Sequence, residues 1–326
     1  MEAETDGVLD AIGKTPLVRL QRVLPDLPFR LYAKLEAANP GGSIKDRAAL
    51  GMIRHAIEEG RIRPGTVIIE SSSGNIGIGI AQVCLYYELR FICVVDVKTT
   101  SQHLQILRAY GAEVEIVETP HPETGDFLEA RLGRVQELLQ RVENGFWPNQ
   151  YANPQNAIAN HRTMEEIAAE LDGKVGSLFC ATSTCGTIRG CAEYARENGL
   201  GTKVYAVDAV GSVIFGGARA QRLIPGHGSG IRPHLCSTEL VDRVVLVSDL
   251  DCVVGCRRLL QSEAILAGGS SGGVLIAVDR VKSEIAAGSN CVVILPDRGE
   301  RYLNSVYSDA WVQEHFGDVA DRWQSP

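Results

Sequence analysis

The sequence has 326 residues, of which 45% are hydrophobic and 22% charged, and its formal net charge is −8. This composition is typical of a globular protein, and the length allows two domains of about 150 residues each. The sequence has no run rich in Lys and Arg that would bind nucleic acid, and no apolar stretch near the roughly 20 residues that span a bilayer. Residues 1–10 are polar and acidic, unlike a signal peptide, so we expect a cytoplasmic protein that binds neither nucleic acid nor membrane.

Short β-rich runs alternate with helical patterns along the chain, as in a parallel, doubly wound α/β fold. The predicted strands are residues 31–37, 66–71, 91–96, 113–118, 177–182, 203–210, 243–249 and 291–297. The predicted helices are residues 48–59, 127–142, 154–171 and 188–197, with another that begins near Ser271. The longest irregular stretch, residues 211–234, is rich in Gly, Arg and His, and loops of this length are usually functional or mobile.

A tight turn, Asn-Pro-Gly-Gly, follows the first predicted strand and leads to Ser43, which we expect to cap a helix. Lys45 then lies in the first turn of that helix, where the macrodipole disfavours a cation. A lysine that loses its proton easily suits covalent attachment to an aldehyde. The same pattern also fits a solvated lysine on the surface.

Two further loops join a strand to a helix and are rich in hydroxyl groups. The first contains Ser72, Ser73, Gly74 and Asn75, and its backbone N–H groups at a helix N-terminus suit a carboxylate. The second forms a phosphate cradle by the same physics, from Ser183, Thr184, Cys185, Gly186 and Thr187. Helix capping is the alternative interpretation of both loops.

The second loop has neither the Lys of a P-loop nor the dinucleotide fingerprint, so it favours a small phosphorylated cofactor and disfavours a nicotinamide dehydrogenase. Farther along, residues 268–273 read Gly-Gly-Ser-Ser-Gly-Gly, which allows close approach to a flat ring or close helix packing. Ser270 in this run can meet a ring nitrogen. Together, the four segments fit one ligand that carries an aldehyde, a phosphate and a ring nitrogen.

The nine cysteines are an odd number, and several lie in apolar runs, so we expect buried, reduced thiols. No Cys-x-x-Cys pair or Cys/His spacing indicates a metal site. We expect Cys185 to differ from the other thiols, because its place at a helix N-terminus would lower its pKa.

At these four segments the chain resembles the fold-type II pyridoxal-phosphate enzymes of the cysteine synthase and cystathionine β-synthase group. The likeness runs from Gly13 to Leu303. It implies two doubly wound domains of the tryptophan synthase β-like kind: a small, mobile substrate-binding domain of residues 40–145, and a large cofactor-binding domain of residues 1–39 plus 146–326. It also implies a homodimer.

The resemblance further assigns roles to residues. Lys45 would bind pyridoxal 5'-phosphate covalently and move the substrate's α-proton, and Asn75 would meet the cofactor's ring hydroxyl. Residues 183–187 would hold the phosphate, and Ser270 would face the pyridine nitrogen. The substrate carboxylate would be bound by Ser72, Ser73, Gly74, Asn75 and Gln150.

Within this group the chain is most similar to the N-(2-amino-2-carboxyethyl)-L-glutamate synthases of 2,3-diaminopropionate biosynthesis, a route to siderophores and antibiotics. They join O-phospho-L-serine to L-glutamate and release phosphate. Arg232, one place later than the group's pattern, would hold the substrate phosphate with Ser183 and Tyr151. Candidate donors for the glutamate carboxylates are Ser212, Arg219 and Arg222.

Three other functions stay open. A cysteine synthase would use sulfide as the nucleophile, with either O-acetylserine or O-phosphoserine as the other substrate. Another amino acid, such as L-aspartate, could be the acceptor. A catalytically silent, ligand-binding regulator is disfavoured by the intact Lys45 and the complete phosphate loop.

Overall fold

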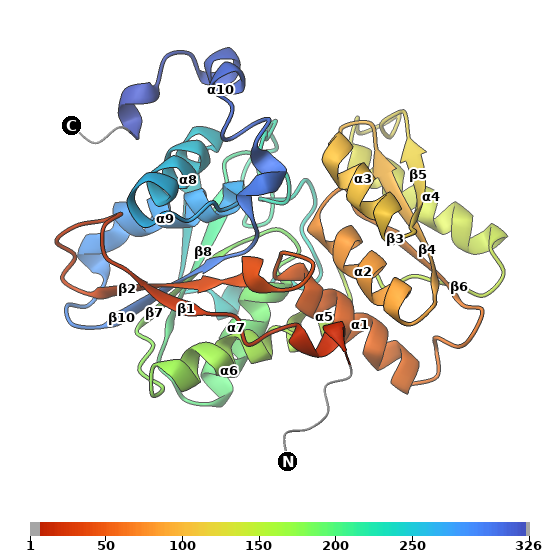
Figure 1. Ribbon diagram of the computed structural model, residues 1–326, viewed down its shortest axis with the longest axis horizontal. Helices are drawn as coiled ribbons and strands as arrows, with labels where there is room; N and C mark the ends of the chain where they lie inside the picture. Colours follow the sequence, from red (N-terminus) through yellow and green to blue (C-terminus); the bar gives the residue numbers. More distant parts are fainter. Residues whose placement is uncertain (1–6, 324–326) are drawn as a thin grey trace.

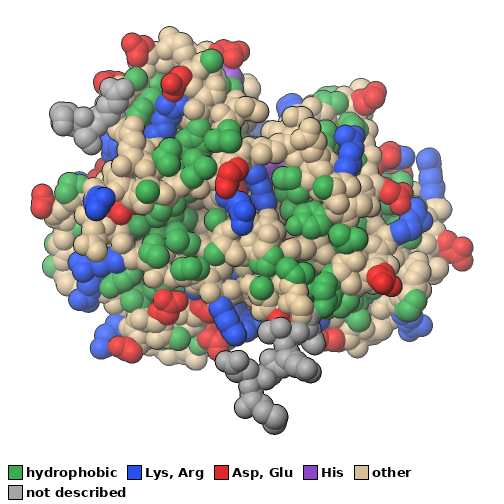
Figure 2. Space-filling view, in the orientation of Figure 1, with side chains coloured by type: hydrophobic (Ala, Val, Ile, Leu, Met, Phe, Trp, Pro, Cys, Tyr) green, Lys and Arg blue, Asp and Glu red, His purple; other side chains and the backbone are tan. Residues whose placement is uncertain are grey.

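The computed structural model describes residues 7–323, so most of the polar N-terminal stretch, residues 1–6, lies outside the described part of the chain. Two sheets organise the structure, and each is covered by helices (Figure 1). On the face drawn in Figure 2, Lys and Arg side chains are interspersed with Asp and Glu. Within residues 7–323, no helix is long and apolar enough to cross a membrane.

The larger sheet has six strands, in the order β1-β2-β10-β7-β8-β9. Only β1 and β2 pair antiparallel, and the other neighbours are parallel. The strands are β1 (Leu17–Leu20), β2 (Arg30–Leu35), β7 (Ser177–Ala181), β8 (Lys203–Ala209), β9 (Arg243–Val247) and β10 (Asn290–Leu295).

The smaller sheet has four parallel strands, in the order β5-β4-β3-β6. They are β3 (Val67–Ser71), β4 (Arg90–Asp96), β5 (Glu113–Val117) and β6 (Gly145–Phe146). All eight strands expected from the sequence are present. The four-residue β1 and the two-residue β6 were not predicted, because runs this short carry no clear periodicity.

The helices are α1 (Lys45–Glu58), α2 (Asn75–Tyr86), α3 (Ser101–Ala109), α4 (Phe127–Arg141), α5 (Pro154–Ile158), α6 (His161–Glu170), α7 (Gly186–Glu197), α8 (Asp249–Glu263), α9 (Gly269–Val281) and α10 (Asp309–Phe316). Short 3₁₀ segments cover Val8–Ala11, Glu36–Ala38, Thr238–Leu240, Lys282–Glu284, Gly299–Tyr302 and Ala320–Arg322. Helices α3, α8 and α10 were not among the predicted elements.

The single helix predicted over residues 154–171 is wrong, because the chain forms α5 and α6 with a break at Asn160. The Asn160 side chain donates from Nδ2 to the carbonyl oxygen of Asn156 at 2.8 Å. In a continuous helix that carbonyl would accept the N–H of Asn160. The Asn160 N–H bonds instead to the oxygen of Ala157, one residue closer.

The carboxyl ends of four strands meet at one region between the two sheets. Strand β3 leads into residues 72–76, β7 into residues 182–187, β8 into the long loop before β9, and β10 into Asp297. Ligands of open parallel sheets bind at such strand ends. Helix α9 packs behind this region, with Val274, Leu275 and Val278 buried against the larger sheet.

Candidate active site

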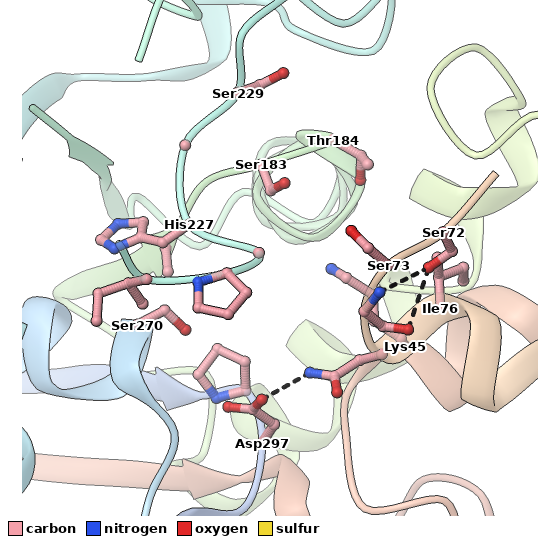
Figure 3. A pocket seen from close by; sticks show the side chains of 18 of the residues that line it. Lys45, Ser72, Ser73, Ile76, Ser183, Thr184, His227, Ser229, Ser270 and Asp297 are labelled. Atoms are coloured by element: carbon pink, nitrogen blue, oxygen red, sulfur yellow. Dashed lines mark hydrogen bonds between the residues drawn. The ribbon is translucent and has the colours of Figure 1, made fainter. Parts of the chain in front are cut away.

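A cavity of about 380 Å³ lies at these strand ends. Its wall includes Lys45, the loop of residues 72–76, the loop of residues 183–187 and Ser270, so all four sequence segments meet in one space. Figure 3 shows their side chains surrounding the same opening, with Ser183 and Thr184 on one side and Lys45 and Asp297 on another.

Lys45 is the first residue of α1 and sits at the end of a forced turn. Gly42 has a φ of 84°, and a Cβ there would lie 2.5 Å from Nε of Arg298, so only glycine fits. The prediction that Ser43 caps the helix is wrong: Ile44 is the N-cap residue. Ser43 forms an isolated β-bridge with Asp297, and its Oγ accepts the N–H of Lys45 at 3.2 Å.

Burial lowers the pKa of Lys45, and the charges of Asp297 and Cys185 offset part of this shift. The sequence analysis attributed the easy loss of the Lys45 proton to the helix dipole, whereas desolvation is the largest cause of the lowered pKa. An amine whose neutral form is favoured is suited to covalent attachment to an aldehyde and to proton transfer.

The loop of residues 183–187 leads directly into α7. Cys185 has a φ of 65°, and the first residues of α7, Gly186 and Thr187, line the cavity at the helix end whose N–H groups have no partner within the helix. A Cβ on Gly186 would collide with the side-chain oxygen of Asn156. The Asn156 amide also donates to Oγ1 of Thr184 at 3.2 Å and fixes that hydroxyl. Backbone donors and hydroxyls at a helix N-terminus form an anion site.

In the loop of residues 72–76, some polar groups hold the loop in place and others line the cavity. Ser72 Oγ accepts the N–H groups of Gly74 at 3.2 Å and Gly77 at 3.0 Å, so this hydroxyl supports the loop. Ser73 Oγ accepts from Nη1 of Arg131 at 3.3 Å. Gln150, also in the wall, donates from Nε2 to the oxygen of Ser71 at 3.0 Å.

Asn75 lies in the wall with both ends of its amide engaged. Its Nδ2 donates to Oδ2 of Asp297 at 2.7 Å, and its Oδ1 accepts from Nη1 of Arg301. Tyr302 donates its hydroxyl to the same Asp297 oxygen at 2.8 Å. This buried network, which the sequence analysis missed, links the smaller sheet's helix α2 to the larger sheet's last strand.

Ser270 is buried in the wall at the start of α9. The glycines around it also provide close packing, because a Cβ on Gly269 would lie 2.5 Å from Cγ2 of Ile224. A Cβ on Gly272 would collide with the backbone of Cys252 in α8. The glycine run therefore packs two helices and at the same time presents Ser270 to the cavity.

Arg131 is the main cation that the sequence analysis missed. It is 7% exposed, lines the cavity and forms an ion pair through Nε with Oδ2 of Asp96 at 3.0 Å. It lies in the middle of α4, 58 residues after Ser73, where no local motif marks it. Tyr151 also lines the cavity; burial raises its pKa to about 12, and the charge of Arg131 opposes that rise.

Arg232 is exposed and does not belong to the cavity wall. Its guanidinium lies beside Cys236 instead. The long loop presents Arg222 to the cavity, ten positions earlier than the residue expected from the sequence.

The predicted low pKa of Cys185 is wrong. A hydrogen bond with Cys236, followed by burial, raises the pKa of the Cys185 thiol. The same hydrogen bond and the charge of Arg232 lower the pKa of Cys236 to about 7, against the opposing effect of its partial burial. All nine cysteines are free thiols, and within residues 7–323 no group of three or more His, Cys, Asp or Glu could hold a metal ion.

The residues of the wall fit pyridoxal 5'-phosphate. Lys45 offers an amine for the aldehyde, the N-terminus of α7 offers donors for the phosphate, and Ser270 offers a neutral hydroxyl for the ring nitrogen. A hydroxyl at that nitrogen, unlike a carboxylate, would not stabilise the charged ring and would therefore favour its unprotonated state.

Comparison with known proteins agrees with this fit. A family model described as pyridoxal-phosphate dependent enzyme matches residues 8–297. A curated relative from Ralstonia nicotianae, named N-(2-amino-2-carboxyethyl)-L-glutamate synthase, is 46% identical over 307 residues, which are 94% of this chain and 90% of the relative.

Two solved structures share the fold along almost their whole length. A hydrogen sulfide-producing enzyme from Fusobacterium nucleatum is 34% identical with a TM-score of 0.85, over 92% of this chain and 100% of that chain. An O-acetylserine dependent cystathionine beta-synthase from Helicobacter pylori is 30% identical with a TM-score of 0.87, over 93% and 99%. The predicted fold-type II class is confirmed, and the chain belongs to the family of pyridoxal-phosphate dependent enzymes.

Proposed function

We propose that this enzyme replaces the phosphate of O-phospho-L-serine with the amine of L-glutamate, giving N-(2-amino-2-carboxyethyl)-L-glutamate and phosphate. The observation that carries the proposal is Arg131, a buried guanidinium in the cavity wall beside Ser73. A leaving phosphate needs a cation and several donors, whereas a leaving acetate needs neither. The name of the Ralstonia nicotianae relative supports the same acceptor and product.

Several residues of the wall have a task in this reaction. The bound cofactor supplies an electron sink for the substrate's α-carbon. Lys45 takes the α-proton and later returns it, and its lowered pKa keeps a neutral amine accessible. The first turn of α2 offers backbone N–H groups, and Ser73 offers a hydroxyl, to hold the substrate carboxylate, while Gly74 and Gln150 support this loop through their hydrogen bonds to Ser72 and Ser71.

Arg131 would bind the phosphate with Tyr151 and Ser183, which also line the cavity. This assignment gives Arg131 the task that the sequence analysis gave to Arg232. Asp96 holds the guanidinium in place through its ion pair at 3.0 Å, so the site is arranged before the substrate arrives.

We further propose that residues 40–145 form the mobile small domain and close over the substrate carboxylate. Closure would exclude water from a reactive intermediate. The hydrogen bond from Asn75 to Asp297 would be one latch, because it joins α2 to the end of β10. The working enzyme is proposed to be a homodimer, which size-exclusion chromatography with light scattering tests.

The main competing function is cysteine synthase activity, which similarity to a hydrogen sulfide-producing enzyme keeps in view. A competition assay separates the two. The holoenzyme is given O-phospho-L-serine with equal concentrations of L-glutamate, L-aspartate and sulfide, and the products are identified by mass. A dominant glutamate adduct supports the proposal, and cysteine or an aspartate adduct as the dominant product contradicts it.

A further inference from the structure

Arg222 is a half-buried cation with unused hydrogen-bonding capacity. It lies in the loop between β8 and β9 and lines the cavity. Its Nε and Nη1 are buried and have no hydrogen-bond partner. Among residues 7–323 it forms no ion pair within 4.0 Å, although Asp208, Asp126 and Asp249 act on it electrostatically. Two buried guanidinium nitrogens without a partner are costly, which indicates that an anionic ligand completes them.

The fold makes a specific space for this guanidinium. Gly228 has a φ of +70°, and a Cβ there would lie 2.8 Å from Nη1 of Arg222. The carboxylate of Asp249 accepts the next two backbone N–H groups, from Leu223 at 3.0 Å and Ile224 at 3.2 Å. Ile224 packs in turn against Gly269 at the start of α9. The backbone on one side of Arg222 is therefore fixed to two helices.

The neighbouring acids are engaged elsewhere. Asp249 accepts the two backbone N–H groups, and Asp126 accepts the N–H of Leu128 at 2.6 Å and pairs with Arg219 at 3.3 Å. Asp208 Oδ1 accepts from Thr182 Oγ1 at 3.0 Å. Its Oδ2 is free of hydrogen bonds but lies beyond ion-pair distance of Arg222.

The two other donors expected in this loop, Ser212 and Arg219, lie outside the cavity wall. Arg219 is exposed and pairs with Asp126 at 3.3 Å and with Glu129 at 3.5 Å. Ser212 Oγ accepts the N–H of Ser229 at 3.1 Å. Of the three candidates for holding the acceptor's carboxylates, Arg222 is the one that faces the cavity with free donors.

We propose that Arg222 binds a carboxylate of the acceptor amino acid and thereby selects a carboxylate-bearing acceptor over sulfide. This inference rests on the proposed function and adds the residue that recognises the second substrate. Arg131, on α4, comes from the smaller sheet's side, and Arg222 comes from the larger sheet's side. The leaving phosphate would be bound by one guanidinium and the acceptor carboxylate by the other. Sulfide has no carboxylate and would not need the second guanidinium.

The test compares Arg222→Gln with the wild-type holoenzyme in two separate measurements. The first is the rate of phosphate release from O-phospho-L-serine without acceptor, which separates an effect on the leaving group from an effect on the acceptor. The second is the KM for L-glutamate, which should rise roughly 10- to 100-fold, the range for losing a charge-assisted hydrogen bond. Arg222→Lys should recover part of the affinity, because it restores the charge without the planar fork.

Selectivity provides a readout that a folding defect would not change. Two analogues of L-glutamate each lack one carboxylate: L-2-aminobutyrate lacks the side-chain carboxylate, and L-glutamic acid α-amide lacks the α-carboxylate. The wild-type enzyme should prefer L-glutamate over the analogue that lacks the carboxylate bound by Arg222. This preference should fall in Arg222→Gln. Glutarate should compete with L-glutamate in the wild type and lose this effect in the variant. Arg219→Gln, in the same loop but outside the cavity wall, is the matched control and should keep both preferences.

The outcomes are distinguishable. An unchanged KM and unchanged preferences in Arg222→Gln overturn the inference while leaving the proposed function intact. Slower phosphate release with an unchanged KM for glutamate also overturns it, since Arg222 would then serve the leaving group. A wild-type enzyme that accepts sulfide but no carboxylate-bearing amine overturns both the inference and the proposed function.

Discussion

Replacing Arg131 with Gln should remove the enzyme's preference for a phosphorylated substrate. The Arg131 guanidinium is 7% exposed, lines the cavity and already donates to Ser73. Loss of a charged hydrogen bond to phosphate costs about 1.5–3 kcal/mol, which corresponds to roughly a 10- to 150-fold loss of kcat/KM.

The same substitution also leaves Asp96 without its partner in a buried position. Breaking a buried ion pair in this way costs about 3–5 kcal/mol of folding stability. A fall in activity alone could therefore come from lost phosphate binding or from misfolded protein, and the assay must measure a quantity that does not depend on the amount of folded protein. The ratio of kcat/KM for O-phospho-L-serine to that for O-acetyl-L-serine does so, because misfolded protein lowers both values equally.

We expect this ratio to fall roughly 10- to 150-fold in Arg131→Gln, since only the phosphorylated substrate loses a charged contact. Arg232→Gln is the matched control, because Arg232 is exposed and outside the cavity wall, and it should leave the ratio unchanged. An unchanged ratio in Arg131→Gln refutes the reasoning, and a fall in Arg232→Gln would restore the role expected from the sequence.

Three further predictions concern Lys45, His227 and the thiol pair. Lys45→Ala should abolish both turnover and the visible band of the lysine-bound cofactor; near-normal kcat would contradict the assignment of Lys45. Burial lowers the pKa of His227 from 6.5 to about 4, so the unfolded chain binds a proton in this window that the folded chain does not. The contribution of His227 to the free energy of unfolding is present above pH 6.5 and is lost as the pH falls to about 4, by up to about 3 kcal/mol. In urea unfolding across this range, the free energy of unfolding of His227→Gln should therefore depend less on pH than that of the wild type. The same pH dependence in both proteins would contradict this. With a pKa of about 7, Cys236 should react with iodoacetamide at pH 8 before Cys185, and peptide mapping that finds Cys185 labelled first would contradict the opposite pKa shifts of the two thiols.

The parts of the site that the sequence predicted are those formed by contiguous residues at strand ends. Lys45, the hydroxyl-rich loop of residues 183–187 and Ser270 each lie at the start of a helix, where local turn chemistry is visible in the sequence. Parallel strands then bring the starts of α1 and α7 to one edge, and the packing of α9 against α8 brings Ser270 to the same place.

The residues that the sequence missed depend on tertiary placement. Arg131 lies within an ordinary amphipathic helix, and only the packing of α4 beside β3 and β4 turns it toward Ser73. Arg222 and Arg232 lie in one irregular loop without periodicity, so their side-chain directions follow from glycine turns and from Asp249 rather than from spacing. The pKa of Cys185 likewise depends on a neighbour 51 positions away, Cys236, which outweighs the local effect of the helix N-terminus.

The most direct test of the central claim follows the visible absorbance of the purified holoenzyme and the release of phosphate through two additions. O-phospho-L-serine should change the cofactor band with release of one phosphate per active site, and L-glutamate should then restore the original band while N-(2-amino-2-carboxyethyl)-L-glutamate accumulates. A band that responds to O-phospho-L-serine but returns only with sulfide would contradict glutamate as the acceptor. A protein with no visible band after incubation with pyridoxal 5'-phosphate would contradict the assignment of the cavity itself.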